Sequence, residues 1–236
     1  MKKTKKRINQ FKQIEVLSEL SKAITSDNYL KDILGLGVTL LSEILNTKIC
    51  SLMLIDEKNQ ELSIKATQSM SGEYLNKPPL KIGEGIVGRV VLEKKPVGIM
   101  DVTKEKGYHY KDMAVKEGLK SMLSMPLLIR NKAIGVLNCY TSKLHKFTNN
   151  EINLVALVAN QLAIVIDNTQ LMLHSKLIEE ELESRKLIER AKGILMSEEG
   201  LSEDLAYKKM QKYSMDTRKS MKEIARAIIT TNELKR

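Results

Sequence analysis

Seven basic residues lie close together near the carboxyl end of the chain. They are Lys208, Lys209, Lys212, Arg218, Lys219, Lys222 and Arg226, and only Asp216 and Glu223 oppose them, which leaves a local charge of +5. Lys219, Lys222 and Arg226 recur at spacings of three and four, so we expect them to share one face of a helix. Such a face can contact the phosphates of a nucleic acid, although many basic helical faces are simply solvated.

Two tyrosines, Tyr207 and Tyr213, flank this basic stretch. Aromatic side chains stack on unpaired bases of RNA, so both tyrosines are candidates for base stacking. Elsewhere, the sequence shows no nucleophile beside a base and no spacing typical of metal ligands. Cys50 and Cys139 lie in apolar runs without a CxxC partner, which favours buried, reduced thiols. We therefore predict a binding protein that is not an enzyme and has no catalytic residues, metal or cofactor.

Three short amphipathic helices are expected to position the basic residues. Their apolar faces are Leu187, Ile188, Ala191, Ile194 and Leu195; Leu201, Leu205, Ala206 and Met210; and Met221, Ile224, Ala225 and Ile228. Gly200 should end the first helix, Ser202 should cap the second, and Asp216 or Thr217 should begin the third. The pattern predicts a small three-helix bundle over residues 185–236.

The segment 185–229 resembles the ANTAR domain, the RNA-binding module of bacterial transcription antiterminators. The match covers IERAKGILM, GLSEDLAY and SMDTRKSMKEIA. By this resemblance the module would bind RNA hairpins and prevent terminator formation. The RNA surface that it implies consists of Arg190, Lys192, Gly193, Arg218, Lys219, Lys222 and Arg226. Ala191 and Gly193 would matter by being small, unless this short segment serves helix packing alone.

The upstream region mixes helices with strands and ends in a hairpin. Helices are expected at 11–25, 29–45, 86–92 and 111–117, and strands at 48–55, 61–67, 96–100, 121–129 and 133–140. This order predicts an α+β domain with one sheet. The last two strands would be joined by Arg130, Asn131 and Lys132. Gly83, Gly85 and Gly88 match GxGxxG only as a string, and we expect them to let a loop turn into a helix.

This region resembles a GAF domain through SLMLIDEKNQELSIKAT, LKIGEGIVGRVVLEKKPVGIMDV, SMLSMPLLIRNKAIGVLNCY and KFTNNEINLVALVANQLAIVIDN. The resemblance implies an antiparallel sheet flanked by helices, with a small-molecule pocket between the sheet and the segments 86–92 and 108–117. Tyr108, His109 and Tyr110 are the candidate pocket residues. The motifs of cyclic-nucleotide and bilin sites are absent, so the ligand stays unidentified. Two strand cysteines do not supply the several pocket cysteines of GAF-fold methionine sulfoxide reductases.

From Thr148 onward the chain has no Pro or Gly until Gly193, which predicts one long helix, with Thr148 and Glu151 as a capping box. A heptad seam runs through Ile166, Gln170, Leu173, Leu177, Glu180, Ser184, Leu187, Ala191 and Ile194. Its spacing indicates a parallel dimeric coiled coil, although a single amphipathic helix would show a similar pattern. The expected organisation is a basic tail (1–12), a GAF-like sensor (13–171), a helical coiled-coil linker (172–184) and an ANTAR-like domain (185–236).

Charge and hydropathy place the protein in the cytoplasm. The net charge is +10, but residues 1–12 alone contribute +6, so the overall value is weak evidence for nucleic-acid binding. No signal peptide is expected, and the apolar run Leu154–Ile166 is shorter than the ~20 residues that span a bilayer. The leading hypothesis is a homodimeric regulator that binds hairpin leader RNA and responds to a signal. A DNA-binding regulator and a reductase-type enzyme with an interaction bundle remain alternatives.

Overall fold

The computed structural model describes residues 30–234 of the chain and contains two compact units that divide between Thr169 and Gln170. The expected basic tail 1–12 and the expected helix 11–25 lie outside the described residues. The first unit is an α+β domain built on a six-stranded antiparallel sheet with the order β3-β2-β1-β6-β5-β4. This arrangement confirms the predicted fold class.

The strands agree closely with the alternating and apolar runs of the sequence. They are β1 (Ile49–Asp56), β2 (Glu61–Thr67), β3 (Leu80–Lys81), β4 (Val97–Ile99), β5 (Ser121–Ile129) and β6 (Lys132–Thr141). Arg130 and Asn131 both have positive φ, 46° and 65°, and Ile129 pairs directly with Lys132. The hairpin loop is therefore a two-residue turn of the type I′ class, one residue shorter than expected, because Lys132 already belongs to β6.

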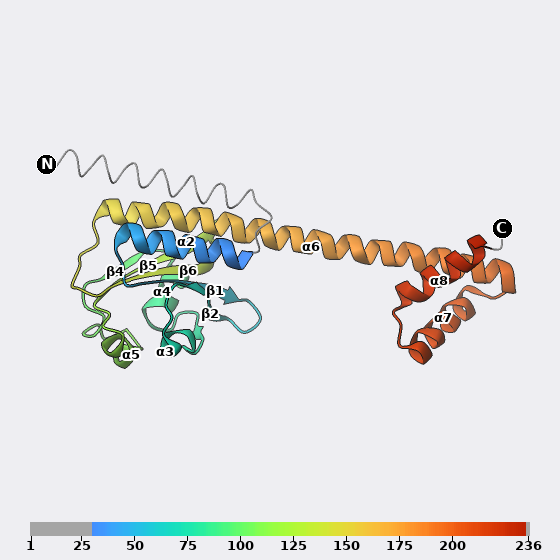
Figure 1. The fold of residues 1–236 in the computed structure, drawn as a ribbon, viewed down its shortest axis with the longest axis horizontal. Coiled ribbons are helices and arrows are strands. Elements are labelled where there is room, and N and C mark those ends of the chain that lie inside the picture. The colour runs from blue at the N-terminus through green and yellow to red at the C-terminus, as the bar shows by residue number, and fades with distance from the viewer. Residues whose placement is uncertain (1–29, 235–236) are drawn as a thin grey trace. The chain divides into compact units, whose positions relative to one another are not determined.

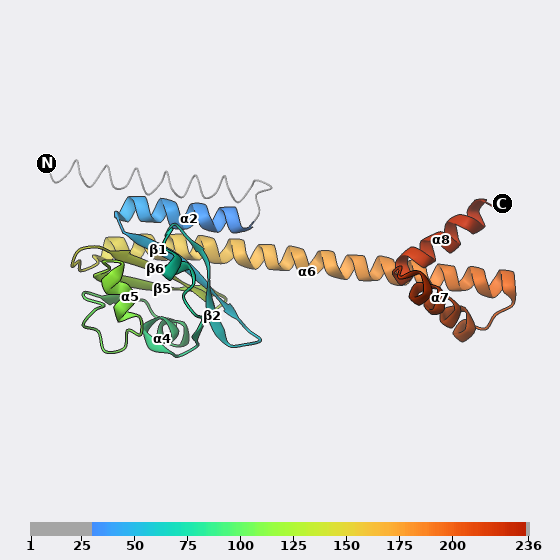
Figure 2. The same ribbon diagram turned by 60° about the horizontal axis from the view of Figure 1, so that its bottom comes forward.

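Helices cover both faces of the sheet (Figure 1). On one face lie α2 (Leu30–Leu45) and the first part of α6 (Asn149–Glu199), whose apolar residues form the main core with the strands. On the other face lie α3 (Gly72–Leu75), α4 (Gly85–Glu93) and α5 (Lys111–Lys116), as Figure 1 shows; α4 and α5 are also labelled in Figure 2. Gly88 of α4 packs so closely that an added Cβ would lie 2.6 Å from the carbonyl oxygen of Lys81. Only glycine permits this approach, which accounts for part of the GxGxxG string.

Helix α6 begins with the predicted capping box. The Glu151 carboxylate accepts the Thr148 N–H at 2.7 Å, and the Thr148 hydroxyl accepts the Glu151 N–H at 3.3 Å. By length and composition alone, α6 is the one helix among the described residues that could cross a membrane, and 44% of its apolar window is buried inside the protein. Leu162 and Ile166 are completely buried against the sheet. We therefore interpret this part of α6 as a core helix.

The second unit is the predicted three-helix bundle, formed by the end of α6 with α7 (Glu203–Thr217) and α8 (Met221–Leu234). Its buried core consists of Ala191, Leu195, Ala206, Met210, Ile224, Ala225 and Ile229. The Ser202 hydroxyl caps α7 as expected. The predicted start of the third helix at Asp216 or Thr217 is wrong, because both residues end α7. Ser220 begins α8 instead, in a reciprocal capping box with Glu223.

Candidate nucleic-acid interface and ligand pocket

Two of the three basic residues predicted to share a helical face do so on α8. Lys222 and Arg226 both pair with Glu183 of α6, with N–O distances of 2.6 and 2.9 Å. The two cations lower the pKa of Glu183 through these hydrogen bonds. Lys219 lies outside the helix, because it precedes the capping residue Ser220. The predicted three-residue helical face is therefore reduced to two residues that already share one carboxylate.

The basic residues of the first motif are also paired with acids. Arg190 bonds Glu233 of α8 at 2.8 Å. Lys192 is only 7% exposed, and its ammonium bonds Glu189 at 2.8 Å and Glu203 at 2.7 Å, which raises its pKa. Lys192 thus joins α6 to the first turn of α7, and contact with a phosphate would require it to leave two carboxylates.

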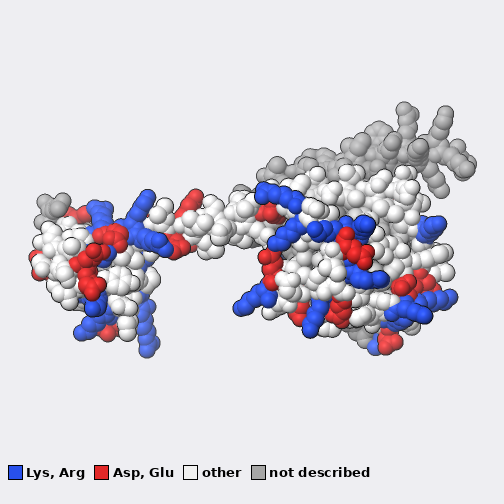
Figure 3. Space-filling view, turned by 180° about the vertical axis from the view of Figure 1, so that it is seen from behind, with Lys and Arg blue, Asp and Glu red and all other residues white. Residues whose placement is uncertain are grey.

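Three other basic residues are more available. Lys212, Arg218 and Lys219 are exposed and form no ion pair with any described residue. Arg218 is the C-cap of α7 and has a φ of +55°, so these side chains come from the end of α7 and the turn that follows. Figure 3 shows acidic side chains lying among the basic ones on the visible face of this unit. The surface is therefore a mixture of free and paired cations.

The two small residues of the first motif differ in environment. Ala191 is completely buried in the bundle core, so it serves helix packing. Gly193 is exposed, and a Cβ added there would meet no other atom within 4 Å. The candidate stacking residues Tyr207 and Tyr213 lie on α7 with 43% and 54% of their surfaces exposed. Both rings are therefore accessible to a molecule that binds at the surface.

The structure separates the three predicted pocket residues. Tyr108 is buried at 4% exposure and packs edge-on against Tyr140, so it belongs to the core. His109 pairs with Glu84 at 3.1 Å on the surface. Tyr110 is the member that lines a described pocket, and its hydroxyl donates to the carbonyl oxygen of Pro78 at 3.1 Å.

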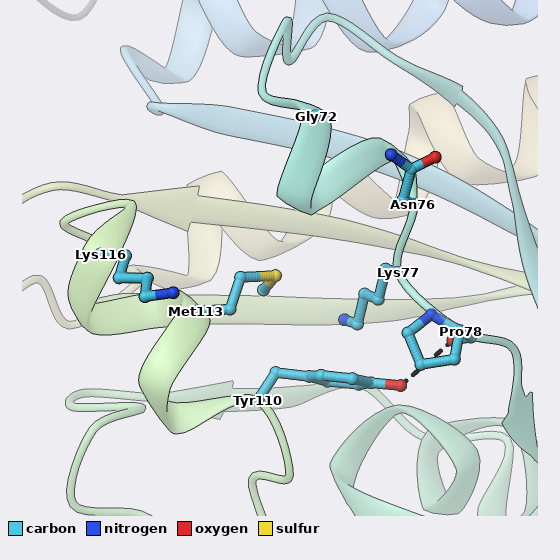
Figure 4. A pocket seen from close by; sticks show the side chains of 7 residues that line it. All are labelled: Gly72, Asn76, Lys77, Pro78, Tyr110, Met113 and Lys116. Atoms are coloured by element: carbon cyan, nitrogen blue, oxygen red, sulfur yellow. Dashed lines mark hydrogen bonds between the residues drawn. The ribbon is translucent and has the colours of Figure 1, made fainter.

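This pocket has a volume of about 540 Å³ and lies between α5 and the segment that joins α3 to β3 (Figure 4). Its lining consists of Gly72, Asn76, Lys77, Pro78, Tyr110, Met113 and Lys116. Sequence reasoning named only Tyr110, although the predicted wall segment 108–117 also contains Met113 and Lys116, and it missed Gly72, Asn76, Lys77 and Pro78. Met113 of α5 follows the N-cap residue Tyr110 by three positions, and this helical spacing was the available signal that Met113 lies on the same side as Tyr110. Within residues 30–234, no group of three His, Cys, Asp or Glu side chains could hold a metal ion.

Two models of known protein families match the chain, one in each of its two compact units. The model of the GAF domain matches residues 29–167, and the model of the ANTAR domain matches residues 177–229. The chain belongs to the GAF domain family and carries a C-terminal ANTAR domain. Both resemblances seen in the sequence are thereby confirmed, and the GAF and ANTAR matches correspond to the two compact units.

Each of the curated relatives compared matches only part of the chain. Over 57 residues the chain is 44% identical to the nitrate regulatory protein of Klebsiella oxytoca, which covers 24% of this chain and 14% of that protein. Over 54 residues it is 44% identical to the transcriptional regulatory protein PdtaR of Mycobacterium tuberculosis, covering 23% and 26%. It is 24% identical over 155 residues to a phosphoenolpyruvate-dependent phosphotransferase system protein of Escherichia coli, covering 66% and 21%. The chain thus spans about a quarter or less of each of these relatives.

Solved structures agree with the GAF fold. The GAF domain of a phosphoenolpyruvate-protein phosphotransferase from Coxiella burnetii superposes with a TM-score of 0.63 at 24% identity, covering 69% of this chain and 96% of that one. A free methionine-R-sulfoxide reductase from Neisseria meningitidis gives a TM-score of 0.59 at 18% identity, covering 68% and 91%. At these identities the likeness shows the fold alone.

The two cysteines of the GAF domain are poorly suited to catalysis. Cys50 of β1 and Cys139 of β6 are partners across the sheet, and both are completely buried. The hydrogen bond with Cys50, together with burial, raises the pKa of the Cys139 thiol well above its usual value. Because the thiolate is the reactive form, a buried and protonated thiol is a weak nucleophile. This environment argues against the reductase alternative.

The expected coiled-coil seam is only partly available on the surface. Its first residue, Ile166, is completely buried in the GAF core, whereas Leu173 and Leu177 are 59% and 63% exposed. Residues 171–183 of α6 are exposed throughout. A seam for a second helix would therefore begin after the GAF core ends and not at Ile166.

Proposed function

We propose that this chain is a signal-responsive, RNA-binding regulator of the antiterminator type. The observation that carries the proposal is the exposed basic surface of the ANTAR domain, where Lys212, Arg218 and Lys219 form no ion pair with any described residue. Lys222 and Arg226 extend this surface along α8. In this proposal the surface binds a hairpin in leader RNA and prevents the terminator from forming.

The GAF domain would supply the signal response, and α6 would connect it to the ANTAR domain. The exposed leucines Leu173 and Leu177 support a homodimer held by a parallel coiled coil, because isolated amphipathic helices are marginal in water. A cytoplasmic location agrees with two domains of regulatory type. The ligand would be a small molecule bound by the GAF domain.

A DNA-binding regulator is the second candidate, because a basic helix in a three-helix bundle can also contact duplex phosphates. The exposed Tyr207 and Tyr213 favour RNA, since the unpaired bases of a hairpin loop can stack on them and paired bases cannot. Competition between a hairpin RNA and duplex DNA for the full-length protein distinguishes the two. Stronger competition by the duplex would replace the RNA proposal with the DNA one.

The direct test is a charge-removal variant, Lys219→Ala/Lys222→Ala/Arg226→Ala, measured for hairpin RNA binding over a range of salt concentrations. Loss of the Lys219 contact should lower the log–log salt slope by roughly 0.7 to 0.9, and loss of the Lys222 and Arg226 contacts should lower it by less, because these two side chains leave Glu183 when they bind. The matched control, Lys95→Ala/Lys106→Ala/Lys143→Ala, removes the same charge from exposed sites of the GAF domain. Equal affinity and slope in the two variants would show that binding depends on overall charge and not on this surface.

A further inference from the structure

Lys77 has an unusual environment for a lysine. It follows Asn76, the C-cap residue of α3, and its ammonium lies 3.9 Å from the ring centre of Tyr110 and 5.8 Å from that of Tyr74. No described carboxylate lies within ion-pair distance of it. Burial lowers the pKa of this ammonium to about 8, which reflects the cost of holding the charge away from water. The aromatic ring faces compensate in part for the missing anion.

The ammonium points into the pocket described above. In Figure 4, the side chains of Lys77 and Lys116 extend toward the same space from opposite sides, with Met113 between them and the Tyr110 ring along one edge. The hydrogen bond from Tyr110 to Pro78 links the two segments that form the walls. The volume of about 540 Å³ lies in the range of about 300–1,000 Å³ that is usual for small-molecule sites.

We propose that this pocket binds a small organic acid as its monoanion, with the carboxylate on Lys77 and the apolar body against Tyr110, Met113 and Pro78. The proposal rests on the sensor role assigned to the GAF domain and names the chemical class of its signal. It does not depend on whether the ANTAR domain binds RNA.

Charge and lining together select this class of ligand. A cationic ligand would meet Lys77 and its like charge, and a neutral one would leave the ammonium without a counter-ion. A monoanion neutralises Lys77 at a half-buried site, whereas each additional charge on the ligand would add the cost of leaving water. The Tyr110 ring and the Met113 side chain offer apolar surface, which suits a flat or aliphatic body better than an inorganic ion.

Binding can be followed in the full-length protein through the methyl resonance of ¹³C-labelled Met113, assigned with Met113→Leu. The probes are benzoate and hexanoate, with benzamide and hexanamide as neutral analogues of the same shape. We expect saturable shifts with at least one acid, and affinity for its amide weaker by about tenfold or more, because a hydrogen bond between charged partners is lost. The absence of saturable shifts with both acids would overturn the proposal.

Three variants test whether the positive charge of Lys77 is responsible for binding the acid. Lys77→Met should weaken binding of the acid by about tenfold or more, and Lys77→Arg should retain most of the affinity because it keeps the cation. Lys95→Met, which removes an exposed lysine elsewhere in the GAF domain, should bind as the wild type does. Wild-type affinity in Lys77→Met, or equal affinity for acid and amide, would refute the assignment. No RNA is present, so this result is independent of the function proposed for the ANTAR domain.

Discussion

Replacing Gly193 with alanine should stabilise the ANTAR domain and weaken RNA binding at the same time. Gly193 lies inside α6, and a Cβ there would contact nothing in the protein. Glycine in a helix interior costs about 1 kcal/mol relative to alanine. No packing contact within the protein therefore requires glycine at this position. Close approach of a bound partner would explain why glycine is present.

The expected gain is about 1 kcal/mol, which corresponds to roughly fivefold slower amide hydrogen exchange in residues 187–199. If the RNA backbone approaches Gly193, the added methyl group should lower hairpin affinity by about tenfold, as overpacking at other close contacts does. Exchange measured by mass spectrometry and binding measured by fluorescence anisotropy would report the two effects separately.

Gly35→Ala is the matched control. Gly35 lies inside α2, and a Cβ there also meets nothing within 4 Å. This substitution should stabilise the GAF domain by a similar amount and leave RNA affinity unchanged. If Gly193→Ala slows exchange and still binds RNA as tightly as Gly35→Ala does, Gly193 is not at the interface and the reasoning fails.

Three further outcomes are expected. Glu183→Gln should raise hairpin affinity by about twofold to tenfold, because Lys222 and Arg226 lose an intramolecular competitor; unchanged anisotropy titrations would contradict this. Leu173→Glu should yield monomers in sedimentation if α6 pairs in parallel, and a persistent dimer would place the interface elsewhere. Tyr74→Phe should destabilise the GAF domain by about 1–3 kcal/mol, because it leaves the buried Ser51 hydroxyl unpaired. Tyr140→Phe should be neutral or stabilising, because it removes a buried hydroxyl that has no hydrogen-bond partner. Protection of the buried thiols during urea titration measures both tyrosine variants, and equal effects would contradict the assignment.

Sequence periodicity was sufficient for the long elements and insufficient for the short ones. The alternating run at β2 and the 3.6-residue periods of α2 and α8 repeat enough times to be recognised. The four residues of α3 and the two of β3 are too few to show any period. Their positions depend on pairing with β2 and on packing against the sheet, which a local pattern does not encode.

The sequence identified the basic residues of the surface but not the acidic residues with which some of them pair. Spacing along the chain identified Lys222 and Arg226 as neighbours. Their shared partner Glu183 lies 39 and 43 residues away, so only the packing of α8 on α6 reveals it. The same limit applies to the pocket. The hydrogen bond from Tyr110 to Pro78 joins residues that are 32 positions apart, so the sequence alone does not show that Lys77, next to Pro78, lies beside Tyr110.

The carboxylate that holds Lys222 and Arg226 also affects how ionic strength would act on recognition. Cations that contact phosphates release the counter-ions condensed on the nucleic acid. When these two side chains move from Glu183 to phosphates, the freed carboxylate attracts cations from solution, so part of the release is cancelled. A salt titration would then report fewer displaced ions than there are phosphates in contact. Because the apparent number of contacts depends on this exchange, binding by such a surface would fall less steeply with salt than binding by a surface of equal charge without internal acids.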